Sequence, residues 1–147
     1  MQIPRSALIL GIAGVLPFVW GGISTHVPSA NGYATDLLGP RFVGPYVQIA
    51  YGTVILSFMS GVLWGFATKA GERQAICFGL SVLPALWAFF AVGGGNVRAT
   101  YALIAGFVCL LALDQLFYNW RLTPPWWMRL RILLTSLVVI CLLFGVL

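Results

Sequence analysis

A carboxylate at the end of an apolar segment is the residue in this chain that most needs a chemical explanation. Asp114 is one of only three acidic residues, and it begins the segment DQLFYNWRLTPPWWMRLR (114–131). A carboxylate within a membrane is costly, and by default it indicates a function with an identifiable partner. Asp114 is therefore a candidate for an ion pair, a proton relay, a cation site, or a contact to a lipid headgroup or a partner protein.

The basic residues that follow Asp114 favour the ion pair. The candidate polar cluster consists of Asp114, Arg121, Arg129 and Arg131. Asp114 precedes Trp120 by about 9 Å of helical rise, which places it near the membrane surface. An ion pair would hold the fourth and fifth apolar segments together at their shared loop. The small residues of the fourth segment lie mostly on another side of the helix, so Asp114 is expected to face a different neighbour or the interface if those residues form the packing face.

The other residues with chemical potential predict neither a catalytic nor a metal site. His26 and Asp36 lie ten residues apart in a loop rich in Pro and Gly, which is a weak pattern for a metal or proton site. Glu72 lies between two basic residues, as a solvated charge would. The three cysteines, Cys77, Cys109 and Cys141, lie in apolar runs without CxxC spacing, which is typical of small buried hydrophobic residues. We therefore expect no enzyme activity, no cofactor and no metal.

Composition indicates that lipid surrounds most of the chain. Of its 147 residues, 61% are hydrophobic and 7% are charged, and its mean hydropathy is +0.98. Five segments are long and apolar enough to cross a bilayer, at residues 6–25, 45–68, 73–93, 99–120 and 124–147. The first is too long for the apolar region of a signal peptide, so we expect it to be retained. These features predict an all-α protein, a compact bundle of five transmembrane helices in one domain (1–147).

The positive charges predict an orientation. With five spans, one side of the membrane holds six basic residues: Arg5, Lys69, Arg73, Arg121, Arg129 and Arg131. The other side holds Arg41 and Arg98. Because Lys and Arg concentrate on the cytoplasmic side, the N-terminus is predicted to be cytoplasmic and the C-terminus periplasmic, in a multi-pass protein of a bacterial inner membrane. The net positive charge therefore does not indicate nucleic-acid binding.

Small residues and prolines predict how the spans pack. Gly11 and Gly14 in the first span, and Ser57, Gly61 and Gly65 in the second, recur at helical spacing and are expected to form close helix contacts. Pro17 and Pro84 should kink the first and third spans, each leaving a carbonyl that a neighbour must satisfy.

The turn before the last span has the composition of a membrane interface. Trp120, Trp126 and Trp127 are predicted to form an interfacial belt, and the nearby Arg side chains suit the headgroup layer. Thr123 is expected to cap a fifth helix whose first positions are Pro124 and Pro125. The alternative is a specific anionic lipid bound at this turn.

Four runs of sequence carry a family resemblance. They are IPRSALILGIAGVLPF (3–18), AYGTVILSFMSGVLWG (50–65), LPALWAFF (83–90) and PPWWMRLRILLTSLVV (124–139). They resemble a widespread bacterial membrane family of unknown function, whose mitochondrial relatives include a small transmembrane protein of animals. The resemblance covers nearly the whole chain and implies a polytopic helical bundle, but no activity. Members often carry a basic residue before the Trp-Gly of the second span, where this chain has Leu63. The Pro/Trp-rich turn is also similar to that of tryptophan-rich sensory proteins, five-span binders of porphyrin and cholesterol, although the order of motifs differs.

Two functional hypotheses follow from the sequence. The first is a non-enzymatic inner-membrane protein that acts as an accessory, assembly or interaction subunit of a membrane complex. The alternative is a small carrier or binder of an apolar or anionic ligand, of lipid, quinone or porphyrin type, between its helices. The expected partners are the lipid bilayer and either another membrane protein or a bound lipid. The ligand hypothesis requires a cavity that reaches Asp114, and a well-packed bundle would contradict it.

Overall fold

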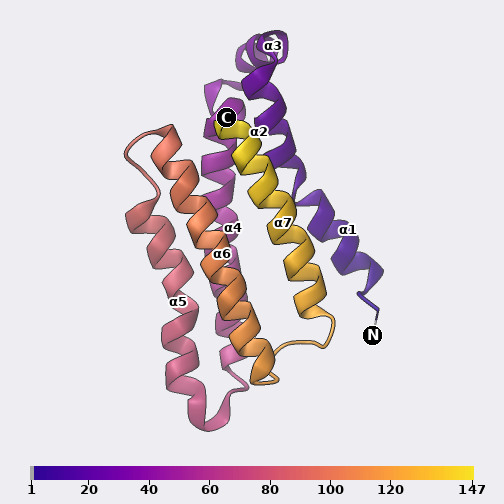
Figure 1. Cartoon of the computed structure of the whole chain (residues 1–147), viewed down its shortest axis with the longest axis vertical. Helices are drawn as coiled ribbons and strands as arrows, with labels where there is room; N and C mark the ends of the chain where they lie inside the picture. Colours follow the sequence, from indigo (N-terminus) through magenta and orange to yellow (C-terminus); the bar gives the residue numbers. More distant parts are fainter. Residues whose placement is uncertain (1) are drawn as a thin grey trace.

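Five long helices form the body of the protein (Figure 1). The structure is a computed structural model that describes residues 2–147, and five helical stretches within it are long and apolar enough to cross a membrane. They are Arg5–His26, Gly44–Ala67, Gly71–Ala91, Asn96–Asn119 and Trp127–Val146. Each lies within a few residues of its predicted range. The chain is therefore an all-helical membrane protein.

The first span bends sharply at an elbow formed by Gly14 and Val15. It consists of α1 (Arg5–Ala13) and α2 (Leu16–His26), and α1 diverges from the bundle in Figure 1. Pro17 lies in the first turn of α2. It has no N–H to donate to the carbonyl of Ala13, and its ring would clash there if the helix continued. The predicted kink is confirmed, and it separates two helices.

The segment between the first two spans is more regular than its composition predicts. The sequence predicts irregular structure at residues 26–44, and this is wrong for α3 (Pro28–Leu38). Val27 is extended, with φ −112° and ψ 97°, and Pro28 then occupies the first turn, where a missing N–H costs nothing. A short 3-10 turn, η1 (Pro40–Phe42), completes the connection. In Figure 1, α3 covers one end of the bundle, beside the C-terminus.

α4 (Gly44–Ala67) lies at the centre of the bundle and packs against α2, α5 (Gln74–Ala91) and α6 (Asn96–Asn119). The 3-10 turn η2 (Gly71–Arg73) joins α4 to α5, and α7 (Trp127–Val146) packs between α6 and α2. The largest fully buried side chains are apolar and include Phe18, Leu56, Leu63, Leu103 and Phe107. The chain ends also follow a five-span arrangement, with the N-terminus and the C-terminus at opposite ends of the long axis (Figure 1).

A serine of α4 contacts the backbone of α5 beside Pro84. Pro84 lies inside the continuous helix, where it has no N–H to donate to the Leu80 carbonyl and its ring crowds that turn. The hydroxyl of Ser60 donates to the Ser81 carbonyl and accepts from the Ala85 N–H at 3.3 Å. We call this arrangement the Ser60 bridge. It shows how a neighbouring helix satisfies backbone groups that a proline exposes.

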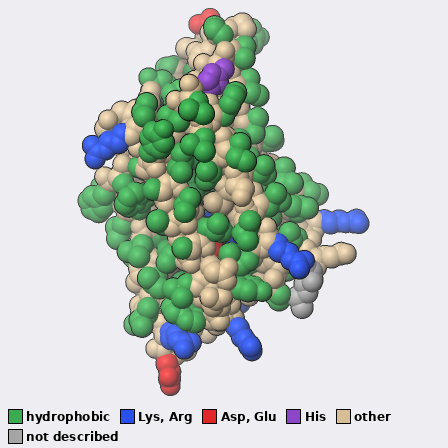
Figure 2. Space-filling model, in the orientation of Figure 1, with side chains coloured by type: hydrophobic (Ala, Val, Ile, Leu, Met, Phe, Trp, Pro, Cys, Tyr) green, Lys and Arg blue, Asp and Glu red, His purple; other side chains and the backbone are tan. Residues whose placement is uncertain are grey.

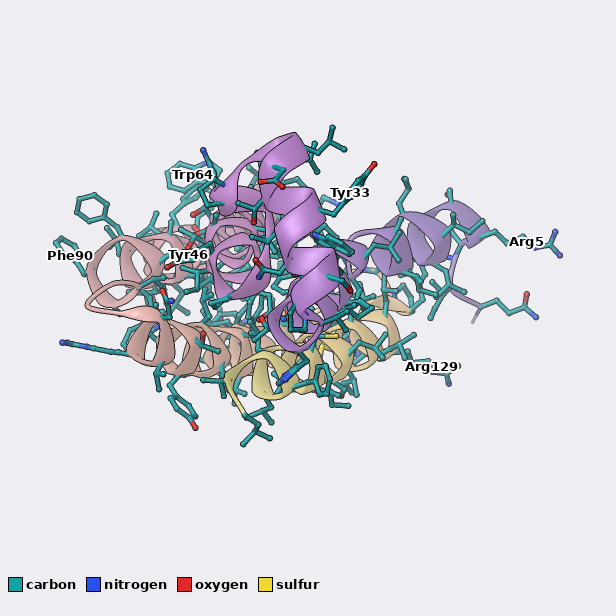
Figure 3. All side chains as sticks on the ribbon, turned by 90° about the horizontal axis from the view of Figure 1, so that it is seen from above. Arg5, Tyr33, Tyr46, Trp64, Phe90 and Arg129 are labelled. Carbon is teal, nitrogen blue, oxygen red and sulfur yellow. The ribbon has the colours of Figure 1, made fainter. Side chains whose placement is uncertain are left out.

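The packing prediction is wrong for the small residues of the second span. No atom of the described chain lies within 4 Å of a Cβ placed on Gly61 or Gly65, and Ser57 is exposed. α4 is rotated so that Leu56, Ser60 and Leu63 face the bundle instead. Figure 3 shows Trp64, which neighbours these small residues, extending away from the bundle.

Other glycines permit the close contacts. A Cβ on Gly52 would lie 2.9 Å from Leu103 Cδ1, and one on Gly106 would lie 2.8 Å from Leu56 Cδ2. A Cβ on Gly11 would likewise lie 2.9 Å from Leu134 Cδ1, so α1 approaches α7 closely at this point. Small residues thus bring backbones together, as expected in lipid, but mostly at other positions than those predicted.

The surface is that of a protein surrounded by lipid. Figure 2 shows hydrophobic side chains over the middle of one face, with most Lys and Arg side chains towards its margins and ends. Phe89 and Phe90 are 77% and 79% exposed, and Figure 3 shows Phe90 pointing outward. Such exposure would be costly in water, so these side chains indicate contact with acyl chains.

Candidate functional site

Asp114 is fully buried and is held by two donors from α7. Arg131 Nε donates to Asp114 Oδ2 at 2.6 Å, and Trp127 Nε1 donates to Asp114 Oδ1 at 2.9 Å. The side chains of Arg131 and Asp114 are 6% and 0% exposed. A buried carboxylate is stable only when a charge and hydrogen bonds compensate its lost hydration, and these two donors provide that compensation.

The rotation of α6 directs Asp114 inward. Asp114 lies on the same face as Leu103, Phe107, Leu110 and Phe117, all of which are buried. The small residues Ala105, Cys109 and Ala112 are exposed, so they do not form the packing face of α6. Asp114 therefore points into the bundle, towards α7.

Of the three candidate arginines, the structure brings Arg131 to Asp114. Arg121 is exposed and has a left-handed backbone with φ 58°. It ends α6: its N–H donates to the Tyr118 carbonyl, and the Leu122 N–H donates to the Phe117 carbonyl. This is the Schellman pattern in which a left-handed residue satisfies the last carbonyls of a helix. Arg121 thus shapes the turn that positions α7.

Arg129 lies apart from the buried pair. It is exposed, and Figure 3 shows it extending outward on the same side as Arg5 of α1. Residues two apart on a helix point in different directions, which explains why Arg129 and Arg131 have different surroundings.

The Trp-rich turn contributes a hydrogen-bond donor to Asp114, which the prediction of an interfacial belt did not include. Trp127 is half-buried, its indole N–H points to Asp114, and its ring packs at 5.1 Å and 90° against Phe66. Trp120 packs beside Phe117, with the Arg73 guanidinium 5.6 Å from its ring centre. Trp126 is half-buried next to Trp127.

The start of the fifth helix differs from the prediction. α7 begins at Trp127 rather than at Pro124, and no side chain caps it. Pro124 and Pro125 belong to the preceding turn, where the Pro124 carbonyl accepts from the Trp127 N–H at 3.0 Å. The Thr123 hydroxyl contacts the Pro124 carbonyl at 3.5 Å instead of capping the helix. Two adjacent prolines favour an extended residue before each ring, which delays the helix.

A cavity of about 310 Å³ lies beside the ion pair, at the elbow between α1 and α2. We call it the elbow cavity. Residues of α1, α2, α4, α6 and α7 line it, and most of them are apolar: Leu10, Gly11, Gly14, Val15, Phe18, Tyr51, Ile55, Phe58, Met59, Phe107, Arg131, Leu134, Thr135 and Val138. Leu10 and Phe58 are strongly exposed, so the cavity communicates with the lipid phase. It reaches Arg131, the partner of Asp114.

Two polar atoms beside this cavity lack hydrogen-bond partners within residues 2–147. They are Nη2 of Arg131 and Oγ1 of Thr135, both buried, and both residues line the cavity. Buried polar groups nearly always have partners, so each such atom requires an explanation. The elbow cavity thus combines an apolar wall with polar groups at one end, which is the usual constitution of a small-molecule site.

Sequence reasoning missed Gln48, a fully buried residue of α4. Its Nε2 donates to the carbonyls of Phe18 at 2.8 Å and Cys141 at 3.0 Å, so it joins α2, α4 and α7. Gly21 and Gly145 give the side chain access to these backbones, because a Cβ at either position would overlap atoms of Gln48. The available signal is a Gln within an apolar run, which is as unusual as Asp114.

His26 and Asp36 lie at the end of the molecule that carries α3, and they have separate surroundings. His26 Nε2 donates to the Phe144 carbonyl at 2.6 Å, and its ring lies 4.5 Å from the Phe144 ring. Asp36 lies in α3, at the same end. Figure 1 places α3 and the turn between α6 and α7 at opposite ends of the molecule, so His26 and Asp36 are remote from the buried pair.

Comparison with known proteins identifies the family. The family described as "protein of unknown function (DUF3429)" matches residues 3–147, which is nearly the whole chain. The chain belongs to this family. No solved structure matches it.

A relative in this family is a vertebrate membrane protein. The chain is 32% identical over 141 residues to Transmembrane protein 69 of Xenopus tropicalis, covering 92% of this chain and 51% of that protein. The chain thus spans about half the length of the curated relative that it matches. The resemblance inferred from the sequence is confirmed at the level of the family: a membrane protein whose function is not known.

Proposed function

We propose that this chain is a non-enzymatic membrane protein that binds an amphiphilic molecule in the elbow cavity. The observation that carries the proposal is the position of Arg131, which holds Asp114 through Nε and is also one of the residues that line an apolar cavity open to lipid. An amphiphile would place its polar group at Arg131 and its apolar part along α1 and α2. The volume of about 310 Å³ is at the lower end for ligand sites, which run from roughly 300 to 1,000 Å³.

The elbow offers a route into the cavity. α1 forms one wall through Leu10 and Gly11, yet it has few contacts with the rest of the bundle, chiefly with α7. The break at Gly14 and Val15 leaves α1 hinged beside the opening. Movement of α1 against α7 would admit a lipid-like molecule sideways from the bilayer without disturbing α4.

Native mass spectrometry of the intact chain tests this proposal. The protein would be extracted with its surrounding lipid in copolymer discs, and bound amphiphiles would be counted after release. Ile55→Phe adds volume inside the cavity, so we expect it to lower the bound fraction at least several-fold. Val54→Phe is the matched control, because Val54 is adjacent on α4 and exposed. Equal occupancy in both variants and the wild type would contradict the proposal.

A second candidate function is that of an interaction subunit in a membrane complex. It is supported by the outward face of α4, where Ser57 is exposed and Gly61 and Gly65 have no neighbour within the described chain. Small residues on a lipid-facing helix permit close approach of another helix. The same native spectra test it, since a subunit would carry a partner protein, whereas masses of the chain with lipid alone would contradict it.

The charge distribution supports a location and an orientation for either function. We infer a multi-pass protein of a bacterial inner membrane, with its N-terminus in the cytoplasm and its C-terminus in the periplasm. Most basic residues then lie on the cytoplasmic side. Asp114 and Arg131 would lie just inside that surface, and the proposed ligand would enter from the cytoplasmic leaflet.

A further inference from the structure

Two buried hydrogen-bond donors beside the elbow cavity have no acceptor within the described chain. A bidentate pair between arginine and a carboxylate uses both carboxylate oxygens. Trp127 already donates to one of them, Oδ1 of Asp114. Arg131 therefore meets the carboxylate through Nε, and its Nη2 has no partner within the described chain. A guanidinium has only donors, so the group that completes this site must be an acceptor.

Thr135 adds a second donor on the same face of α7. It lies four residues after Arg131, and side chains at this spacing are neighbours on a helix. Its hydroxyl is buried, and no described residue provides it with a hydrogen-bond partner. Both residues are at most about a twentieth exposed, Arg131 at 5% and Thr135 at 4%. One acceptor atom at this end of the cavity would satisfy both.

The charge balance of the site selects an uncharged acceptor. Asp114 and Arg131 already neutralise each other within hydrogen-bond distance. A carboxylate or phosphate would add an uncompensated negative charge next to Asp114, in a cavity with mostly apolar walls, and desolvating such a charge is costly. A carbonyl oxygen accepts two hydrogen bonds without a formal charge.

The shape of the cavity fits a carbonyl with an apolar tail. Along α7 the lining runs from Arg131 to Val138, about 10 Å of helix. Beyond Thr135 the lining is apolar, apart from the hydroxyl of Tyr51. Arg131 lies about one turn inside the start of α7, so the carbonyl would lie just below the membrane surface.

We propose that the elbow cavity binds an uncharged amphiphile through a carbonyl oxygen, which accepts hydrogen bonds from Nη2 of Arg131 and Oγ1 of Thr135. This rests on the proposed function and specifies the chemistry of its ligand. The carbonyl has two chemical sources in a membrane, the ester of a lipid and the ring of a quinone. Both offer the same acceptor and carry an apolar chain.

Photolabelling with competition tests the proposal on the full chain in lipid nanodiscs. The probe is a palmitoyl methyl ester with a diazirine in its tail, and labelled residues are mapped by mass spectrometry. The competitors are methyl palmitate, decylubiquinone, palmitate and hexadecane. We expect labelling on α1 and α7, and competition by one of the two carbonyl compounds at concentrations at least ten-fold lower than palmitate or hexadecane. Stronger competition by methyl palmitate indicates a lipid ester, and stronger competition by decylubiquinone indicates a quinone.

Thr135→Val isolates the polar contact. Valine has nearly the same shape as threonine, and the hydroxyl that it removes has no partner in the described chain, so the fold should be retained. We expect it to weaken competition by the better carbonyl compound about ten-fold and to leave hexadecane unchanged. Thr135→Ser keeps the hydroxyl and should keep the affinity.

The possible failures are distinguishable. Best competition by palmitate would show that the site takes an anion and would overturn the carbonyl assignment. Equal competition by hexadecane, or unchanged competition in Thr135→Val, would show that the cavity binds apolar chains without a hydrogen bond to a carbonyl. The carbonyl assignment would then be wrong, and the proposed function would remain. Absence of labelling on α1 and α7 with every probe would overturn the proposed function as well.

Discussion

At the scale of single residues, the feature that organises the end of the bundle near the α6–α7 turn is the buried pair of Asp114 and Arg131. Each residue alone would be an uncompensated charge in an apolar interior. Their separation of 2.6 Å, with Trp127 on the second carboxylate oxygen, gives each oxygen of the acid a hydrogen-bond donor. Replacing both residues by apolar ones should therefore destabilise the protein less than replacing either residue alone.

A double-mutant cycle at this pair should show strong coupling. We expect Asp114→Leu and Arg131→Met each to lower the free energy of unfolding by about 3–5 kcal/mol, because each leaves a buried charge without a partner. The double variant replaces both charges by apolar groups, so it should lose much less than the sum. Thermal unfolding in detergent, followed by circular dichroism, measures the cycle.

Arg98→Met is the control for this cycle. Arg98 is exposed on α6 and lies outside the pair, so its replacement should change the free energy of unfolding by no more than about 0.5 kcal/mol. Losses that simply add in the double variant would show that Asp114 and Arg131 do not depend on each other.

At the scale of elements, the helices are joined by polar side chains that reach the backbone of a neighbour. Ser60 bridges α4 to α5, Gln48 joins α4 to α2 and α7, and Ser24 of α2 accepts from the Gly44 N–H at 2.7 Å at the start of α4. The contacts of Ser60 and Ser24 occur where a helix carries a proline or begins, and there the backbone has groups to satisfy. These contacts specify which helices pack together, because apolar contacts alone are compatible with several arrangements.

The Ser60 bridge predicts an interaction between two substitutions. Ser60→Ala leaves the Ser81 carbonyl and the Ala85 N–H without the bridging hydroxyl, which should cost about 1–3 kcal/mol of unfolding free energy. Pro84→Ala in the same chain lets α5 close its own hydrogen bonds, so the double variant should recover most of the loss.

Thermal unfolding would again report the difference. Ser57→Ala provides the comparison, since Ser57 is on the exposed side of the same helix. If the double variant Ser60→Ala, Pro84→Ala were no more stable than Ser60→Ala alone, the Ser60 hydroxyl would not compensate for the effect of Pro84 on α5.

The same scale shows how far sequence predicts structure here. Hydropathy locates the five spans because a run of about 20 apolar residues is a property of composition alone. It does not locate α3, whose helix depends on the extended Val27 and on Pro28 at the first turn. Small residues indicate that close helix contacts exist, but they do not show which face of a helix makes them. Gly61 and Gly65 face outward, because the rotation of α4 about its own axis depends on its packing against all of its neighbours.

The candidate site was predictable in its residues but not in its geometry. Asp114 is conspicuous as a rare acid in an apolar run, and Arg131 is one of three nearby bases. Which base reaches it depends on the turn that Arg121 and the two prolines impose. The elbow cavity depends on how far α1 diverges at Gly14, and no local pattern in the sequence encodes that divergence.

At the scale of the whole molecule, the distribution of charge should fix the orientation in the membrane. Single cysteines would replace Lys69 and Arg41, which lie at opposite ends, in a chain whose three natural cysteines are changed to alanine. We expect a membrane-impermeant maleimide to label position 41 in spheroplasts and position 69 only after permeabilisation. The reverse pattern would place the N-terminus outside and move the elbow cavity to the other leaflet.

The buried pair also has a consequence for how the chain is made. Asp114 and Arg131 are separated by 17 positions and lie on consecutive helices, so the acid leaves the ribosome before its partner does. An unpaired charge costs roughly 3 kcal/mol to insert at the centre of a span, and less near its end. The last two spans are therefore more stable when they leave the translocon together, as a closed hairpin, than when they leave one after the other. Stable integration of α6 would then depend on the insertion of α7.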